Sequence, residues 1–394
     1  MGQLLSVVGD RITLVVLPFA VLASGGSTQD VGWVIAAQTL PFLVLALFGG
    51  VIADRGNRRG VMIASDAVRM AAQAVAAVLV LSDSAEIWQL AVCAAAYGGA
   101  DAFFSPAMTG LIPQTLSRVD QLQPANALRS MTYSIGSVIG PAAAGILIAL
   151  EGPGLGLAVD AATFAVSIAV LARLRPREAA LVTSSDDAPP DSGMLAELRG
   201  GWRAVRSRDW VLWSLGAMCV YHVIVLPSVY VLGPVLAQDE LGGPEAWAAI
   251  SVAFGLGTIA GDLVLLRWRP RHAMRVAATA LVFASCQAVI FGSGLPLGAI
   301  CALEMLAAVG VTMMFALWET SLAEHIPSRE LSRVSSYDYM VNVGLVPVGV
   351  ALAAPFSDAV GIHTALALMS AVGVATALAL LSVRSVRTLA RGTA

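Results

Sequence analysis

Residues 32–82 read GWVIAAQTLPFLVLALFGGVIADRGNRRGVMIASDAVRMAAQAVAAVLVLS. Two apolar runs, 32–53 and 61–82, flank a short basic turn in this stretch. Each run has about the twenty residues that a helix needs to cross a bilayer core of roughly 30 Å. Runs of this length recur along the whole chain, and we predict twelve membrane-spanning helices. They are expected near residues 4–23, 32–53, 61–82, 87–109, 126–149, 155–174, 211–236, 246–266, 273–293, 296–318, 336–355 and 362–383.

The amino-acid composition supports the same fold class. Hydrophobic types make up 58% of the 394 residues, charged types make up 12%, and the mean hydropathy is +0.80. Soluble domains carry about a quarter charged residues, so this deficit argues against a water-exposed surface. A membrane β-barrel would alternate polar and apolar residues over about ten positions, and that pattern does not dominate here. We therefore expect an all-α membrane protein, in which the four cysteines lie in apolar runs and pack as small side chains.

The basic residues predict how the chain is oriented in the membrane. All 23 of them are Arg, and every Arg that lies in a connection follows an even-numbered span. The connections after odd-numbered spans hold acidic residues instead. Because an excess of Arg marks cytoplasmic connections, both termini are expected in the cytoplasm and the chain in the inner (plasma) membrane. No basic leader precedes the first span, so we expect the natural chain to begin further upstream.

The chain is expected to divide into two six-helix bundles, residues 1–175 and 211–384, followed by a cytoplasmic tail, 385–394. The halves resemble each other, because Ile-Pro followed by Leu-Ser-Arg-Val at 112–119 recurs at 326–334. Parallel repeats of this kind place a substrate site between the two bundles. The linker, 176–210, should carry a surface helix from residue 194 onward, where apolar residues recur at helical spacing.

The turn after the second span contains Gly50, Asp54, Arg55, Arg58 and Arg59. This pattern resembles motif A of the major facilitator superfamily, which implies twelve transmembrane helices in two six-helix bundles. The resemblance also implies that the five residues form a gate on the cytoplasmic side. Physically, a glycine lets a neighbouring helix approach closely, and an Asp caps a helix or pairs with Arg. The alternative is an ordinary basic turn on the cytoplasmic side.

The fifth span resembles motif C, the signature of the drug:proton antiporter branch of that superfamily. Its residues are Gly136, Gly140, Pro141 and Gly145. The proline bends a helix, and the glycines make a smooth face, expected to pack on the glycines of the eighth span. Generic small-residue packing is the alternative. Shorter motifs, such as Asp66 with Arg69 and Phe103 to Ala107, are similar to macrolide and siderophore (enterobactin-type) exporters. The chain departs from many antiporters at Asp101, because its fourth span holds no Arg.

Ionisable residues inside spans are costly unless they face the protein interior, so they are candidates for coupling and substrate binding. They are Asp10, Arg11, Asp66, Arg69, Asp101, Asp160, Asp262 and Glu304. Asp66 and Arg69 are three positions apart and are expected to pair, either structurally or functionally. Asp101 and Glu304 have no nearby partner in the sequence, and we hypothesise that one of them carries a coupling proton. His222 is expected to be a packed polar residue.

These observations favour a secondary active transporter that exports a hydrophobic or amphiphilic small molecule, such as a drug, macrolide or siderophore, in exchange for protons. A nutrient importer on the same fold and a non-transporting receptor or scaffold stay open. An ATP-driven pump or an enzyme is disfavoured, because a chain without Lys holds no Lys-containing phosphate loop. The expected partners are the substrate, protons and the bilayer, with no nucleic acid, metal or cofactor; the resemblance implies a monomer powered by the proton gradient.

Overall fold

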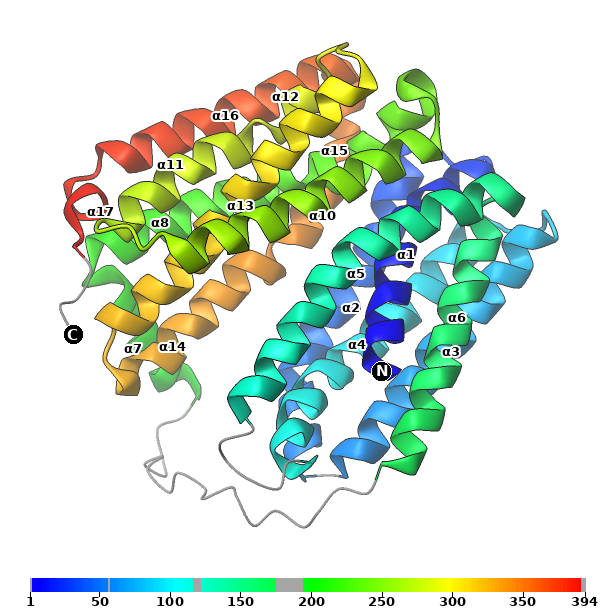
Figure 1. Ribbon diagram of the computed structural model, residues 1–394, viewed down its shortest axis with the longest axis horizontal. Coiled ribbons are helices and arrows are strands. Elements are labelled where there is room, and N and C mark those ends of the chain that lie inside the picture. Colours follow the sequence, from blue (N-terminus) through cyan, green and yellow to red (C-terminus); the bar gives the residue numbers. More distant parts are fainter. Residues whose placement is uncertain (1, 56, 116–121, 175–193, 391–394) are drawn as a thin grey trace. The chain divides into compact units, whose positions relative to one another are not determined.

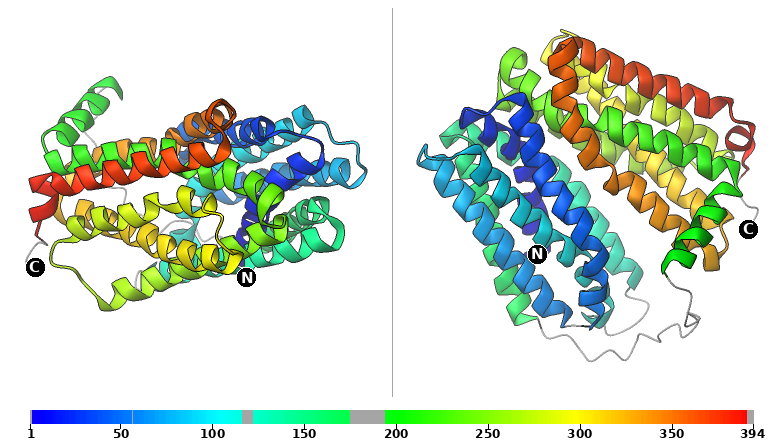
Figure 2. Two further views of the ribbon diagram at one scale, coloured as in Figure 1. Left: turned by 90° about the horizontal axis from the view of Figure 1, so that it is seen from above. Right: turned by 180° about the vertical axis from the view of Figure 1, so that it is seen from behind.

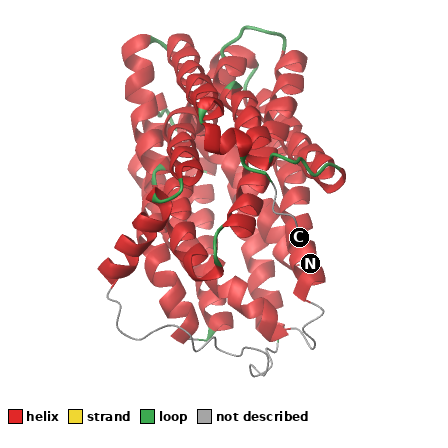
Figure 3. Cartoon of the chain, turned by 90° about the vertical axis from the view of Figure 1, so that its left-hand side faces the viewer, coloured by secondary structure: helices red, strands yellow, loops and turns green. Residues whose placement is uncertain are grey.

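The computed structural model describes residues 2–55, 57–115, 122–174 and 194–390. In these ranges the chain forms helices joined by short loops, and it contains no β-strand (Figure 3). The helices of the first half are α1 (Gly2–Ala23), α2 (Thr28–Arg55), α3 (Arg58–Leu81), α4 (Ile87–Thr115), α5 (Leu122–Glu151) and α6 (Pro153–Arg173). A further helix, α7 (Met194–Arg206), precedes the second half.

The second half contains regular helices and short π-helical segments. The α-helices are α8 (Asp209–Val220), α9 (Gly233–Leu236), α10 (Pro244–Arg267), α11 (Ala273–Ser285), α12 (Gln287–Phe291), α13 (Leu297–His325), α14 (Ser328–Tyr339), α15 (Val346–Val360), α16 (Ile362–Ser382) and α17 (Arg384–Thr388). The π-helical segments are η2 (Tyr221–Val225), η3 (Ser228–Leu232), η4 (Ala237–Leu241) and η5 (Met340–Gly344).

Each of the twelve predicted spans corresponds to a helix or to a continuous helical stretch. Ten of these are long and apolar enough to cross a membrane within the described residues. The other two predicted spans are α2 and α4, which are 28 and 29 residues long. The expected fold class, an all-α membrane protein with twelve spans, is therefore confirmed.

The chain separates into two compact units. The first comprises Met1–Asp186 and Ala237–Val252, and the second comprises Asp187–Leu236 and Ala253–Ala394. In the first unit α2 lies beside α4, α3 beside α6, and α1 between α5 and α6 (Figures 1 and 2). Gly98 of α4 faces the backbone carbonyl of Gln38 in α2, where any Cβ would collide with it. A missing side chain thus lets these two helices approach closely.

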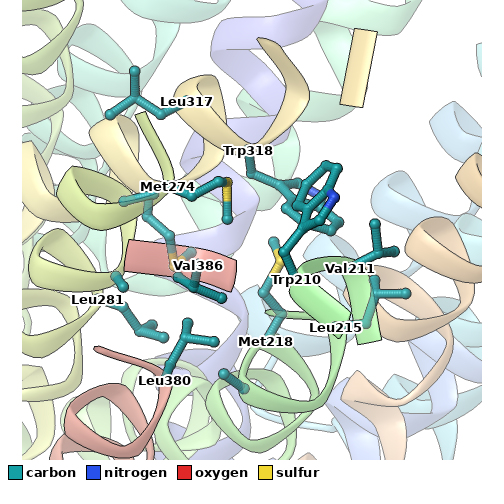
Figure 4. Packing of buried hydrophobic residues seen from close by; sticks show 14 of the residues in the cluster. Trp210, Val211, Leu215, Met218, Met274, Leu281, Leu317, Trp318, Leu380 and Val386 are labelled. Carbon is teal, nitrogen blue, oxygen red and sulfur yellow. The ribbon is translucent and has the colours of Figure 1, made fainter. Parts of the chain in front are cut away.

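The second unit has a large apolar core built from α8, α11, α13, α16 and α17. Figure 4 shows part of it, with Trp210 and Trp318 beside Met218 and Leu215. The two indole rings meet edge to face with centroids 5.7 Å apart, a favoured aromatic geometry. The Trp318 indole N–H donates to Asp338 Oδ1 at 2.7 Å, so the polar edge of this buried ring is satisfied.

Three spans of the second unit are interrupted rather than regular. The seventh span changes from α8 to π-helical segments at Tyr221, the ninth breaks at Cys286 between α11 and α12, and the eleventh contains η5. At the break in the ninth span, the Val289 backbone N–H donates to Ser370 Oγ at 2.8 Å. A side chain from α16 thus satisfies a backbone group at the break.

The helix expected after the linker is α7, which ends at Arg206. One face of α7 packs on α14: Gly201 lies against Tyr337, and the Trp202 ring lies 5.9 Å from the Tyr337 ring. Just beyond α7, Arg208 donates to Glu330 Oε2 at 2.8 Å. Helix α7 is therefore attached to the second unit at α14.

Candidate functional site

Arg59 ties the basic turn to the end of α6. Helix α3 begins after Asn57, whose side-chain oxygen accepts a hydrogen bond from the Gly60 backbone N–H at 3.2 Å. The Arg59 guanidinium donates to the carbonyl of Leu171 at 2.7 Å and to that of Ala172. Positive charge at a helix C-terminus is stabilising, because the last carbonyls lack helical partners. The structure describes the backbone of Gly50, Asp54 and Arg55 but not their side-chain surroundings, so the gate role stays a prediction.

The motif C glycines of α5 mainly face α1, which corrects the expected packing. A Cβ at Gly136 would lie 2.8 Å from Val7 Cγ1, and one at Gly140 would collide with Arg11 Cβ. Only Gly145 meets α10, through Ala248 Cβ at 2.7 Å. The eighth-span glycines pack elsewhere, because Gly257 and Gly261 face α13. The glycines of α5 and those of α10 therefore serve different helix pairs. Pro141 lies inside α5, directly after Gly140.

Arg69 of α3 is the centre of a buried ionic network. It pairs with Asp66 one turn earlier on the same helix, as predicted. It also reaches Asp101 Oδ1 of α4 at 3.1 Å and Asp10 Oδ1 of α1 at 3.7 Å. The side chains of Arg69 and Asp66 are 1% and 0% exposed, whereas those of Asp10 and Asp101 are 34% and 36% exposed. We call Asp10, Asp66, Arg69 and Asp101 the Arg69 network.

Asp101 has no partner nearby in the sequence, but the folded chain gives it one. Its partner, Arg69, is 32 positions away in the sequence, and only the packing of α3 on α4 brings the two charges together. Arg11 is different from its neighbour Asp10. Its Cβ abuts Gly140, and within the described residues it makes no ion pair. Of the two first-span candidates, only Asp10 belongs to the network.

Further polar and aromatic groups hold the network in place. Tyr97 donates to Asp10 Oδ1 at 2.5 Å, and Ser167 donates to Asp66 Oδ2 at 2.6 Å. The Arg69 guanidinium lies 4.3 Å from the Phe104 ring centroid and 4.5 Å from the Phe164 centroid. Both distances are within the range of cation–π attraction, which is strongest when water is excluded. The guanidinium is thus fixed by rings as well as by carboxylates.

A second cluster lies next to the network around Asp160 of α6, whose side chain is fully buried. Its Oδ2 accepts hydrogen bonds from Thr13 at 2.7 Å and from Gln73 at 2.6 Å. With Asp160, four carboxyl groups share the neighbourhood of one guanidinium. Because carboxyl groups outnumber the positive charge, the cluster can bind protons or a cationic group. The sequence offered only a weak signal for Thr13, Gln73 and Tyr97, which are polar residues inside apolar spans.

Glu304 of α13 lies in the second unit, where it is 1% exposed. Its Oε2 accepts a hydrogen bond from Gln287 Nε2 at 3.2 Å, and Tyr221 donates to Gln287 Oε1 at 2.8 Å. His222, next to Tyr221, is also buried; its Nδ1 lies 2.8 Å from the Met218 carbonyl and its ring packs on Phe315. The packed environment expected for His222 is therefore present.

An all-helical chain with twelve spans in two similar halves, and with ionic side chains buried inside the spans, is a polytopic membrane transporter. The chain belongs to the Major Facilitator Superfamily, whose family model matches residues 1–342. As a member of this family it is a multi-pass protein of the cell membrane.

Named relatives place the chain within the superfamily. It is 29% identical over 377 residues to the multidrug efflux pump Tap of Mycolicibacterium fortuitum. The match covers 90% of this chain and 87% of that protein. It is 23% identical over 374 residues to macrolide efflux protein A of Streptococcus pyogenes. The match covers 92% of this chain and 89% of that protein. The resemblance to the drug:proton antiporter branch is thereby confirmed.

A solved structure supports the fold. The crystal structure of a peptide transporter POT in complex with sulfate matches with a TM-score of 0.74 and 13% identity, covering 99% of this chain and 95% of that one. At this identity the match bears on the fold alone.

Proposed function

We propose that this protein exports a hydrophobic or amphiphilic small molecule, such as a drug or macrolide, and takes up protons in exchange. The observation that carries the proposal is the Arg69 network, in which three carboxyl groups pair with one guanidinium inside the spans, together with the buried Asp160 close by. Buried ionisable groups in a transporter mark ion and substrate pathways, because they are costly anywhere else in a membrane. The names of the efflux relatives support the cargo class and the outward direction.

The proposal also covers the working unit, the energy source and the orientation in the membrane. The working unit is a monomer, and the proton gradient is the energy source, without a cofactor and without chemical conversion of the cargo. Both termini and the arginine-rich connections face the cytoplasm, in agreement with the one-sided distribution of Arg.

Inside-out vesicles from cells that express the protein provide the test. A proton gradient is imposed, and macrolides, tetracyclines, dyes and siderophores are added one at a time while a pH-sensitive dye reports the gradient. We expect particular compounds to dissipate the gradient, and we expect Asp54→Asn to abolish this response while the protein still reaches the membrane. No response to any compound from folded, inserted protein would contradict proton-coupled export.

The same experiment separates the alternatives. A nutrient importer would respond to sugars or other metabolites and not to the hydrophobic compounds. A receptor or scaffold would keep its cellular effect after Asp54→Asn, because it needs no transport cycle.

A further inference from the structure

Tyr221, Gln287 and Glu304 form a continuous chain of polar side chains in the apolar interior of the second unit. All three are at most 2% exposed. The Tyr221 hydroxyl donates to Gln287 Oε1 at 2.8 Å, and Gln287 Nε2 donates to Glu304 Oε2 at 3.2 Å. The phenol therefore fixes the orientation of the amide, and the amide directs its N–H toward the carboxyl group.

The two oxygens of Glu304 differ in their surroundings. Oε2 has the Gln287 donor, whereas Oε1 is buried and has no hydrogen-bond partner among the residues that the structure describes. Within the described residues, no Arg or His lies within ion-pair distance of this carboxyl group. An ionised carboxylate that is buried with one neutral donor is costly, because the charge has lost its water and gained no counter-charge. A protonated carboxyl group avoids most of that cost.

The network of the first unit has the opposite character. Asp66 and Asp101 both lie beside the positive charge of the Arg69 guanidinium. The sequence alone left Asp101 and Glu304 equivalent, and the structure distinguishes them. Of these two, Glu304 has an oxygen free for a proton and, among the described residues, no cation in contact with it.

Three other titratable groups face Glu304 within the described residues. They are the phenol of Tyr221 at the start of η2, the thiol of Cys286 at the break in the ninth span and the thiol of Cys301 on α13 itself. None of them supplies a positive charge, so the protonation state of Glu304 depends on its own burial and on Gln287.

Both partners of Glu304 lie where a span is interrupted. Tyr221 is the first residue of the π-helical segment η2, and Gln287 is the first residue of α12 after the break at Cys286. Interrupted helices within proteins frequently mark functional sites, because their backbone hydrogen bonds rearrange more easily than those of a regular helix. Rearrangement of these two spans would open a route for a proton to the buried oxygen.

We propose that Glu304 is a proton-binding site of the transport cycle, with Gln287 and Tyr221 as its positioning residues. The O–H bond forms at Oε1 when a proton arrives from the outer solution, and it breaks when the proton leaves toward the cytoplasm. This inference rests on the proposed function, and it places one proton-binding site in the second unit.

Infrared difference spectroscopy of purified, reconstituted protein tests proton binding without transport. Spectra taken across a pH series should contain the C=O band of a protonated carboxyl group, and this band should be lost in Glu304→Gln. Glu324→Gln is the matched control, because Glu324 lies on the same helix and is exposed. A band of unchanged size in folded Glu304→Gln would overturn the proposal.

Two further variants keep the Glu304 carboxyl group and change its positioning residues. In Gln287→Ala the midpoint of the titration should move to higher pH, because the lost amide N–H stabilised the ionised form. Tyr221→Phe should move it in the same direction by a smaller amount, since the amide is then only less well oriented. Midpoints that stay in place in both variants would remove their positioning role.

The vesicle assay distinguishes failure of this inference from failure of the proposed function. If the parent protein dissipates the gradient and Glu304→Gln does not, both hold. If the parent and Glu304→Gln dissipate it equally, export stands and the role of Glu304 falls. If the parent itself gives no response to any compound, the proposed function falls.

Discussion

At the scale of single residues, Arg69 and Asp66 carry charges that are almost fully withdrawn from solvent. Replacing Arg69 by Met leaves Asp66 buried with Ser167 as its remaining donor. Removing one partner of a buried pair costs about 3–5 kcal/mol, whereas replacing both partners by apolar residues is often neutral. We therefore expect Arg69→Met to lower the thermal unfolding temperature strongly, and Arg69→Met with Asp66→Leu to recover most of the loss.

The measurement is thermal unfolding of detergent-purified protein, with Asp101→Asn as a comparison. Asp101 is 36% exposed, so its removal should cost about 1 kcal/mol or less. Equal unfolding temperatures for the parent and Arg69→Met would contradict the idea that the buried Asp66 carboxylate depends on this partner.

At the scale of secondary-structure elements, the contact between α1 and α5 depends on Gly140. A Cβ there would collide with Arg11 Cβ, so Gly140→Ala must push the two helices apart. Overpacking of this kind costs about 1–3 kcal/mol. Gly216→Ala in α8 is the matched control, because nothing lies within 4 Å of its Cβ position. Thermal unfolding should show a loss for Gly140→Ala and none for Gly216→Ala; similar values would refute the close approach.

The attachment of α7 to α14 gives a second prediction for an element. A side chain at Gly201 would meet the Tyr337 ring at 2.9 Å and the Arg333 carbonyl at 3.1 Å. Gly201→Val should therefore detach α7 and speed backbone hydrogen exchange over residues 194–206, measured by mass spectrometry. Gly216→Val should leave exchange in this segment unchanged. Slow exchange in both variants would mean that α7 holds its position without this contact.

The positions of the spans could be predicted from the sequence, whereas the breaks inside them could not. Apolar runs and the arginines at their ends mark the start of α3 at Arg58 and the end of α10 at Arg267. The break at Cys286 leaves no such mark, because it depends on Ser370 of a distant helix accepting from Val289. The pairing of Asp101 with Arg69 was hidden for the same reason: it exists only once α3 and α4 pack together.

At the scale of the whole molecule, the orientation in the membrane can be measured directly. In a background with the four cysteines replaced, Ser84→Cys lies in the connection after the third span and Ser207→Cys lies between α7 and α8. Both positions are exposed. A membrane-impermeant maleimide added to intact cells should label Ser84→Cys and not Ser207→Cys, and the reverse pattern in inside-out vesicles serves as the control. Labelling of Ser207→Cys in intact cells would invert the proposed topology.

The fixed position of the Arg69 side chain has an electrical consequence. Its guanidinium packs against the rings of Phe104 and Phe164 and is paired with Asp66 on its own helix. A charge held in this way is not carried through the membrane field with the cargo. We therefore expect the current of each turnover to equal the charge of the protons minus that of the cargo. A neutral compound and a monovalent cation exchanged for the same number of protons should then give currents that differ by one elementary charge per molecule.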